Sequence, residues 1–345
     1  MAKKITFLVF TCLSIISFSQ IGGESVFTFL KFPVSARMEG MGGGLQSIQN
    51  DDLSLAFSNP SLIDSSLHKQ IAFTGSFFPA DIKYGDLIYA HYHKMIKTCL
   101  TYGVQYAAYG KFDMRDAAGN PMGTFKAADF NIQVGAARNF KNFHYGVNLK
   151  FILSHLDSYS SLAFAADVAL GYHNPKTRWS ATLILRNAGF QAKPYIKNEP
   201  REKLPLQLDL SFSKRFKHLP LTLSVTAHDL QVWNLRYPEE EQTNVIFGTT
   251  KKKKNTAIDN IFRHIDIGME IEAGKPVRLR FGYNHLRRQE LGTGTKKGFA
   301  GISAGFGLVI KQFAFDYAFA AYHRSGNDHQ LSLRIKLDEF GHKAK

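Results

Sequence analysis

Residues 100–108 read Leu-Thr-Tyr-Gly-Val-Gln-Tyr-Ala-Ala, so that large apolar side chains alternate with polar or small ones. Alternation with period two is typical of a β-strand whose two faces meet different surroundings. The pattern returns at residues 129–136, 145–153, 206–212, 265–271, 277–283, 313–319 and 331–337. It therefore predicts an all-β protein built from many similar strands.

A soluble β-sandwich alternates too, so the lengths of strands and connections decide the class. The predicted strands run ~9–14 residues, longer than the ~5–6 usual in soluble sheets and matched to a tilted bilayer crossing. Short connections, near residues 95, 141, 175, 218, 275 and 311, alternate with longer ones, among them residues 110–123 and the longest, residues 229–261. Bacterial outer-membrane barrels have this layout of short periplasmic turns and longer outer loops.

The segments predict a transmembrane antiparallel β-barrel of about fourteen strands, an even count that places every short connection on the periplasmic side. The strands are expected to begin near residues 70, 86, 97, 124, 143, 160, 177, 204, 220, 262, 276, 298, 312 and 327. The predicted division is a signal peptide at residues 1–19, a hatch or plug at 20–69, the barrel at 70–340 and a short tail at 341–345.

The N-terminus has the composition of a secretory signal. Lys3 and Lys4 supply a positive region, and residues 5–16 form an apolar core too short to span a bilayer, which needs ~20 residues. Small side chains in Ser17-Phe18-Ser19 predict cleavage before Gln20. An uncleaved anchor helix is the alternative interpretation. Export by the general secretory route to the outer membrane is the expectation.

The amino-acid composition agrees with a location in the outer membrane. Aromatic residues make up 13% of the chain and the mean hydropathy is −0.18, as expected where lipid-facing apolar and lumen-facing polar positions alternate. The formal charge of +15 would suit nucleic acid, but an exported chain favours anionic lipid headgroups or a protein partner. After removal of the signal, Cys99 is the only cysteine, so the mature chain has no internal disulfide.

Residues 20–69 lack sustained alternation and are rich in glycine and turn residues, which allows a segment to fold tightly inside a lumen. A fourteen-strand barrel is too wide for its own side chains to fill, and a plug is a common solution. A phosphate-binding loop is a poor interpretation of the glycine cluster at residues 40–44, because no Lys-Ser or Lys-Thr follows it.

Short motifs follow one another in this segment: Gly22-Gly23, Phe29-Leu30, Pro33 before Ser35-Ala36-Arg37, Gly42-Gly43, Asp51-Asp52, and Asn59-Pro60. In this order they resemble the start of the PorV/PorQ group of type IX secretion proteins, within the FadL-like barrels. The run at residues 20–30 looks closest to the PorQ members. Ser61 departs from the group, which usually has alanine there, but serine is small enough to leave the turn intact. The resemblance spans the mature chain, and only its N-terminal part is specific.

The resemblance implies a fourteen-strand barrel with a hatch that works with other secretion-system proteins. PorV-like members receive or shuttle exported cargo. PorQ-like members are linked to the surface attachment complex that couples cargo to lipopolysaccharide, chiefly by holding a surface partner. The implied protein is a non-enzymatic subunit without cofactors. Its partners would be other type IX secretion and attachment-complex proteins, together with outer-membrane lipid and lipopolysaccharide, and not nucleic acid.

The candidate hatch residues are Arg37, Gly42, Gly43, Asp51, Asp52, Asn59 and Pro60. They are expected either to bind a ligand or to lock the plug against lumen-facing charges such as Arg278, Arg280, Asp266 and Glu270. The alternative is that they only cap turns and neutralise the lumen. Because Arg or Lys facing lipid costs ~2–4 kcal/mol at the midplane, such charges fix strand register in either case.

The strongest charge run lies in the longest predicted outer loop and consists of Lys251, Lys252, Lys253 and Lys254, with Arg287 and Arg288 in the next one. Lysine is a mobile point charge that binds phosphates, so these residues are candidates for contact with lipopolysaccharide or a surface partner. A solvated loop is the alternative, and the acidic run at residues 239–241 argues against a uniformly basic surface.

No motif predicts catalysis or a metal site. The sequence has no Gly-x-Ser-x-Gly and no His-Glu-x-x-His. His91 and His93 share a strand face, but no third ligand lies nearby, and their aromatic neighbours suggest an interfacial belt instead.

The competing function is a FadL-like transporter of hydrophobic small molecules. It predicts an apolar pocket behind the hatch and a break in the strand wall, whereas a docking subunit predicts a blocked lumen and an ordered loop surface.

Overall fold

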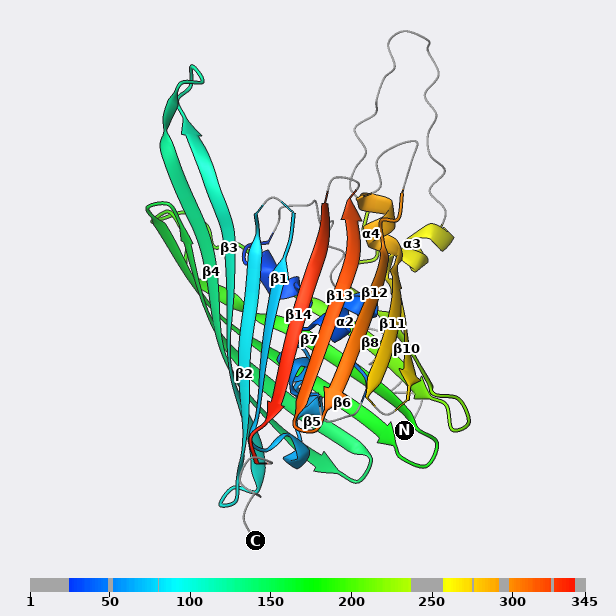
Figure 1. Ribbon diagram of the computed structural model, residues 1–345. Coiled ribbons are helices and arrows are strands. Elements are labelled where there is room, and N and C mark those ends of the chain that lie inside the picture. Colours follow the sequence, from blue (N-terminus) through cyan, green and yellow to red (C-terminus); the bar gives the residue numbers. More distant parts are fainter. Residues whose placement is uncertain are drawn as a thin grey trace, which may run out of the picture.

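The computed structural model describes residues 25–48, 52–79, 81–236, 257–274, 276–291, 298–323 and 326–338. Fourteen antiparallel strands close into one barrel in which each strand pairs with its sequence neighbours and β1 pairs with β14 (Figure 1). This confirms the predicted fold class. The signal peptide, Asp51, the lysine run and Phe340 lie outside the described residues.

The strands are β1 (Gln70–Phe77), β2 (Lys83–His93), β3 (Thr98–Arg115), β4 (Pro121–Phe140), β5 (Phe143–Leu156), β6 (Tyr159–Asn174), β7 (Trp179–Lys193), β8 (Gln207–Arg215), β9 (Leu221–Ala227), β10 (Ile265–Ala273), β11 (Val277–Asn284), β12 (Ile302–Ile310), β13 (Phe313–His323) and β14 (Gly326–Lys336). Each begins within four residues of its predicted start. We call the end of the barrel with the short connections the periplasmic end, and the other the outer end.

The alternation produces two unlike faces. In β4, Phe130, Ile132 and Val134 are 38–49% exposed on the outside, whereas Asn131 and Gln133 between them are buried at 0% and 2%. The other strands repeat this pattern, so an apolar belt surrounds a polar lumen. That is the arrangement of a barrel whose outer wall is solvated by lipid. Among the described residues, no helix has the length and apolar character needed to cross a membrane.

Strand lengths differ around the barrel. β3 to β7 have 14–20 residues, whereas β8 to β11 have 7–9. The expected loop at residues 110–123 is therefore wrong in part. β3 continues to Arg115 and β4 begins at Pro121, and this hairpin rises above its neighbours (Figure 1). Side chains on both faces of this extension are solvated, so it lacks the alternation that marks strands within the belt.

The hatch is a chain of short turns inside the barrel: η1 (Thr28–Lys31), α2 (Ala36–Gly40), η2 (Leu53–Phe57), η3 (Pro60–Leu62) and η4 (Ser65–Leu67). Its side chains cap its own turns. Ser35 accepts a hydrogen bond from the N–H group of Met38, and Asp52 accepts one from that of Ser54. Caps of this kind let turns too short to be stable alone persist within the lumen.

The hatch has an apolar core of its own. Leu53, Leu55, Phe57, Ile63 and Leu67 are at most 1% exposed and cluster with side chains of β1 to β3. Burial of each large side chain contributes about 1.5–3 kcal/mol. The hatch is therefore a packed part of the fold.

Two helices stand at the outer end, α3 (Ala257–Arg263) after β9 and α4 (His285–Glu290) after β11 (Figure 1). They contact each other, and α4 also contacts β10. We call these two helices, with residues 229–236 and 298–300, the outer cap.

Candidate functional site: the plugged lumen

Arg37 connects the hatch to the barrel wall. It stands in the first turn of α2 and is 5% exposed. Its guanidinium donates to both carboxylate oxygens of Glu270 in β10, at 2.9 and 2.6 Å, and to Asp52 of the hatch at 3.1 Å. Two-point pairing of a guanidinium with a carboxylate fixes direction as well as distance. This contact fixes the orientation of α2 against the strand.

The network continues along the wall with alternating charge. Arg280 of β11 lies 2.7 Å from Glu270 and 2.6 Å from Asp316 of β13. Arg334 of β14 lies 3.1 Å from Asp316 and 3.4 Å from Asp52. Three arginines and three carboxylates thus close a ring through the hatch and four strands. Buried charges are tolerated when they are paired in this way, and removal of one partner is costly because the other stays buried.

A second ionic contact holds the hatch from above. Glu39 at the end of α2 accepts from Arg287 of α4 at 2.7 Å, and the guanidinium of Arg287 lies over the ring of Tyr322 at 4.0 Å. The side chain of Arg287 is only 10% exposed. Arg287 was proposed from the sequence as a partner contact, but in the structure it points inward to the hatch. Arg288, its neighbour on α4, is half-buried.

Glycines let the hatch backbone lie directly against the wall. Gly42 and Gly43 have φ values of 91° and 85°, in the left-handed region that favours glycine. The N–H group of Gly42 donates to Ser303 of β12 at 3.0 Å. At Gly282 of β11, a Cβ atom would collide with the backbone of Met41 and Gly42. Gly42 and Gly43 therefore allow the hatch backbone to lie close to the barrel wall.

Asn59 and Pro60 form the lower turn of the hatch. The side chain of Asn59 accepts from the N–H group of Ser61 at 2.9 Å and donates to the carbonyl of Gln46 at 2.5 Å. The hydroxyl of Ser61 donates to Asn59 at 2.7 Å, so the serine adds a bond that alanine would lack. The Pro60 carbonyl lies against the position of a Cβ atom at Gly146 of β5.

Of the lumen charges predicted as locks, Glu270 and Arg280 join the hatch network and Arg278 does not. Arg278 lies 3.9 Å from Glu272 at the periplasmic end. Asp266 lies against Gly44 and 3.7 Å from the ring of His228. Asp316, Arg334 and Glu39 are further partners that the sequence pattern did not single out. The first two occupy lumen positions of the alternation, which was the available signal.

His228 lies between two carboxylates at the outer end of β9. Its ring is 3.0 Å from Asp229 and 3.7 Å from Asp266. Burial lowers the pKa of His228, but the carboxylates of Asp266 and Asp229 outweigh it and raise the pKa to about 9. Asp229 also meets Lys31 of η1 at 3.5 Å, so this cluster contacts the first turn of the hatch.

The outer half of the lumen is filled by apolar side chains of η1 and its flanks. Phe27, Phe29 and Leu30 are buried together with Tyr84 of β2 and Ile152 of β5. The chain enters beside the β7–β8 loop, where Val26 donates to the carbonyl of Lys203 at 3.0 Å. An apolar site exists at this level, and the protein's own N-terminal segment occupies it.

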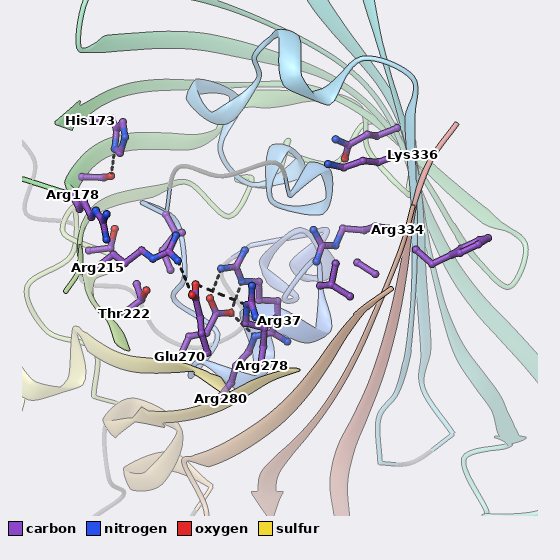
Figure 2. Close-up of a pocket in the computed structure, with 18 of the residues that line it drawn as sticks. Arg37, His173, Arg178, Arg215, Thr222, Glu270, Arg278, Arg280, Arg334 and Lys336 are labelled. Atoms are coloured by element: carbon purple, nitrogen blue, oxygen red, sulfur yellow. Dashed lines mark hydrogen bonds and ion pairs between the residues drawn. The ribbon is translucent and has the colours of Figure 1, made fainter. Parts of the chain in front are cut away.

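Below the hatch, a cavity of about 620 Å³ faces the periplasmic end. Figure 2 shows Arg37, Glu270 and Arg280 meeting in it, with Arg178, Arg215 and Arg278 nearby. Its lining is strongly basic, unlike the apolar filling of the outer half.

No group of three or more His, Cys, Asp or Glu side chains among the described residues is arranged to hold a metal ion. His91 and His93 meet edge to face at 4.7 Å between ring centres, and His91 meets His68 in the same way at 5.0 Å. Cys99 is buried in β3 as a free thiol.

These features define an outer-membrane β-barrel with an N-terminal hatch locked into its lumen. The sequence matches no protein-family model and no curated protein. Solved structures with the same fold include the Pseudomonas putida toluene transporter TodX, at 10% identity over 88% of this chain and 97% of TodX, with a TM-score of 0.54. The Ralstonia pickettii toluene transporter TbuX is similar at 12% identity over 90% of this chain and 98% of its own, with a TM-score of 0.52. At these identities the likeness shows the fold alone, a closed β-barrel preceded by an N-terminal segment, as the sequence predicted.

Proposed function

We propose that this protein is a non-enzymatic subunit of the type IX secretion system that holds a surface partner on its outer cap. The motif order of the hatch supports the secretion system, and the structure of the outer cap supports the docking role. The observation that carries the proposal is that the outer cap is folded, rigidly paired and apolar on its surface.

Asp259 of α3 is the centre of the outer cap. It accepts from Arg236 at 2.9 Å, from Arg263 at 3.0 Å and from His285 of α4 at 3.1 Å. Burial raises the pKa of Asp259, but hydrogen bonds from His285 and Arg263 outweigh it and hold the pKa below its usual value. The carboxylate is thus charged at neutral pH, and it joins the loop after β9 to the loop after β11.

The surface of this cap carries side chains of the kind that anchor interfaces. Trp233 is 66% exposed, Ile258 64% and Phe299 78%. All three belong to connections and not to the strands of the apolar belt. Large exposed apolar groups on a rigid loop surface mark interaction sites, and tryptophan is over-represented among residues that dominate binding energy. Contact of Arg288 and of Lys251 to Lys254 with lipopolysaccharide phosphates is part of the same proposal.

Photo-crosslinking in cells with an active type IX system tests the docking role. A benzophenone amino acid at Trp233 or Phe299 should capture a secretion or attachment-complex protein. The same probe at Leu149, which is 62% exposed on the apolar belt, is the matched control and should capture none. Capture of no secretion component from the cap positions would exclude the proposal.

The comparisons favour a second function, transport of hydrophobic small molecules, because both transporters named above carry toluene. The apolar site filled by Phe27, Phe29 and Leu30 supports it as well, since a solute of similar character would fit if the segment moved. Uptake of radiolabelled toluene into proteoliposomes tests this function. Uptake above that of empty vesicles, lost when the barrel is cross-linked to η1, would favour transport over docking.

A further inference from the structure

Basic side chains dominate the cavity at the periplasmic end (Figure 2). Eight basic residues line it against two acidic ones, Glu270 and Glu272; the basic residues are Arg37, Arg178, Arg215, Arg278, Arg280, Lys311, Arg334 and Lys336. A cavity of about 620 Å³ is of the size that binds small ligands or part of a larger one. The excess of positive charge selects for anions.

In the inner part of this cavity, positive charges are already neutralised by carboxylates. Arg37, Arg280 and Arg334 are paired with carboxylates in the ring described above. At the mouth, Glu272 is the acidic residue of the lining and is engaged by Arg215 at 2.6 Å and Arg278 at 3.9 Å. The excess charge therefore lies at the mouth and not against the hatch.

Arg178 and Lys311 are the mouth residues that best mark a ligand. Both are exposed, and no carboxylate of the described chain is recorded within ion-pair distance of either. Their φ values are 56° and 49°, in the left-handed region where glycine or asparagine costs less. The same conformation recurs at Lys97 and Lys141 in the equivalent turns, so it belongs to the turns, and the position in the cavity lining is what singles out Arg178 and Lys311.

The two residues stand far apart on the rim. Arg178 belongs to the β6–β7 turn and Lys311 to the β12–β13 turn, and six steps around a barrel of fourteen strands separate them. A single small ion cannot touch both, whereas a chain with several anionic groups can cross the mouth. Guanidinium groups pair with carboxylates through two parallel hydrogen bonds. The hatch above, with Arg37 and Ile48 in the lining, limits how far such a chain enters.

We propose that the periplasmic mouth of the barrel binds an acidic, extended polypeptide segment of a periplasmic protein. This site is separate from the outer cap and does not depend on the partner held there. Binding at this site is distinct from a general attraction of the rim to anionic lipid headgroups, because Arg178 and Lys311 line the cavity. Lys97 and Lys141 show the difference, since they occupy equivalent turns with φ values of 51° and 55° but do not line the cavity.

Fluorescence anisotropy with labelled octaglutamate and the detergent-solubilised mature protein tests the proposal. We expect saturable binding that weakens with added salt. Arg178→Gln with Lys311→Gln should weaken binding about fivefold to tenfold, because two exposed ion pairs are lost. Lys97→Gln with Lys141→Gln is the matched control and should change binding less than about twofold. Each variant is first checked for the folded barrel by its migration in unheated gels.

Three results would overturn the proposal. Absence of saturable octaglutamate binding would remove the site. Equal losses in the two double variants would assign the binding to surface charge around the whole rim. Tighter binding of tripolyphosphate than of octaglutamate would assign the site to phosphate ligands in place of a polypeptide.

Discussion

Glu270 is the residue on which the lock of the hatch depends, because it pairs with Arg37 of the hatch and Arg280 of the wall at once. Glu270→Gln leaves both guanidiniums buried with less compensating charge, and we expect a loss of about 3–5 kcal/mol in stability. Thermal unfolding in detergent measures the loss, and limited proteolysis shows whether the hatch is released.

Glu272→Gln is the control within the same strand. Glu272 also pairs with two arginines, but its side chain is 21% exposed and that of Arg215 is 53% exposed, so solvent screens the pair. A loss below about 1 kcal/mol is expected. Equal stability of the two variants would show that the buried ring does not hold the hatch.

His228 gives the outer end of the hatch a dependence on pH. Its folded pKa of about 9 lies above the value of ~6.5 expected when unfolded. The stabilisation is therefore fully present below pH ~6.5 and is lost as the pH rises through about 9, in total on the order of 3 kcal/mol. The titratable groups that face the ring are Asp229, Asp266, Asp209, His264 and Glu290. The unfolding temperature should fall between pH 6.5 and 9.5, and His228→Gln should reduce the fall; an equal fall in both proteins would contradict this assignment.

At the scale of elements, the contact between α2 and the wall depends on strand glycines. Gly282→Ala in β11 places a methyl group against the backbone of Met41 and Gly42, which cannot rotate away as a side chain would. We expect the hatch to loosen at a cost of about 1–3 kcal/mol while the barrel remains closed. Hydrogen exchange of residues 36–43 measures the loosening.

Gly75→Ala in β1 is the matched control. A Cβ atom there would meet only the ring of Phe73, at 3.9 Å. Because glycine in a strand carries an entropic cost, this change should be neutral or slightly stabilising. If Gly75→Ala loosened the hatch as much as Gly282→Ala, close approach would not be the reason for glycine at residue 282.

The elements differ in how far the sequence predicts them. Strands within the belt were predicted because each must place apolar side chains on one face, and once β10 and β11 pair, Glu270 and Arg280 become register partners. The inward turn of Arg287 was not predictable, because a loop residue can point either way and its partner Glu39 lies 248 positions earlier. Asp316 and Arg334 were visible as lumen positions, but their pairing with the hatch depends on how the hatch folds.

At the scale of the whole molecule, the wall and the plug were both predicted from physical requirements. Repeated alternation requires a closed surface between lipid and a polar lumen, and a lumen this wide requires filling. The unequal strand lengths were not predicted, because a hairpin that extends into solvent is no longer constrained by the bilayer. The position of the plug along the barrel axis was not predicted either, because a series of short turns does not indicate which part of the lumen it fills.

A plug that fills the lumen predicts that the intact protein conducts ions poorly. Leu53, Leu55 and Phe57 are buried where a channel would pass, while the β1–β14 ladder pairs residues 70–77 with residues 329–336, all outside the deleted segment. Deletion of residues 20–69 should therefore leave a closed barrel whose conductance in a planar bilayer is at least about tenfold higher than that of the intact protein.

The Glu270→Gln variant keeps the hatch in the chain but weakens its attachment, so it tests whether the hatch can be released without being deleted. If the buried ring of charges keeps the hatch in place, this variant should alternate between the low conductance of the intact protein and the high conductance of the deletion. Steady high conductance of the intact protein, equal to that of the deletion, would show that the hatch does not block the lumen. That result would favour passage of solutes over docking as the work of this barrel, because a docking subunit has no need of an open pore.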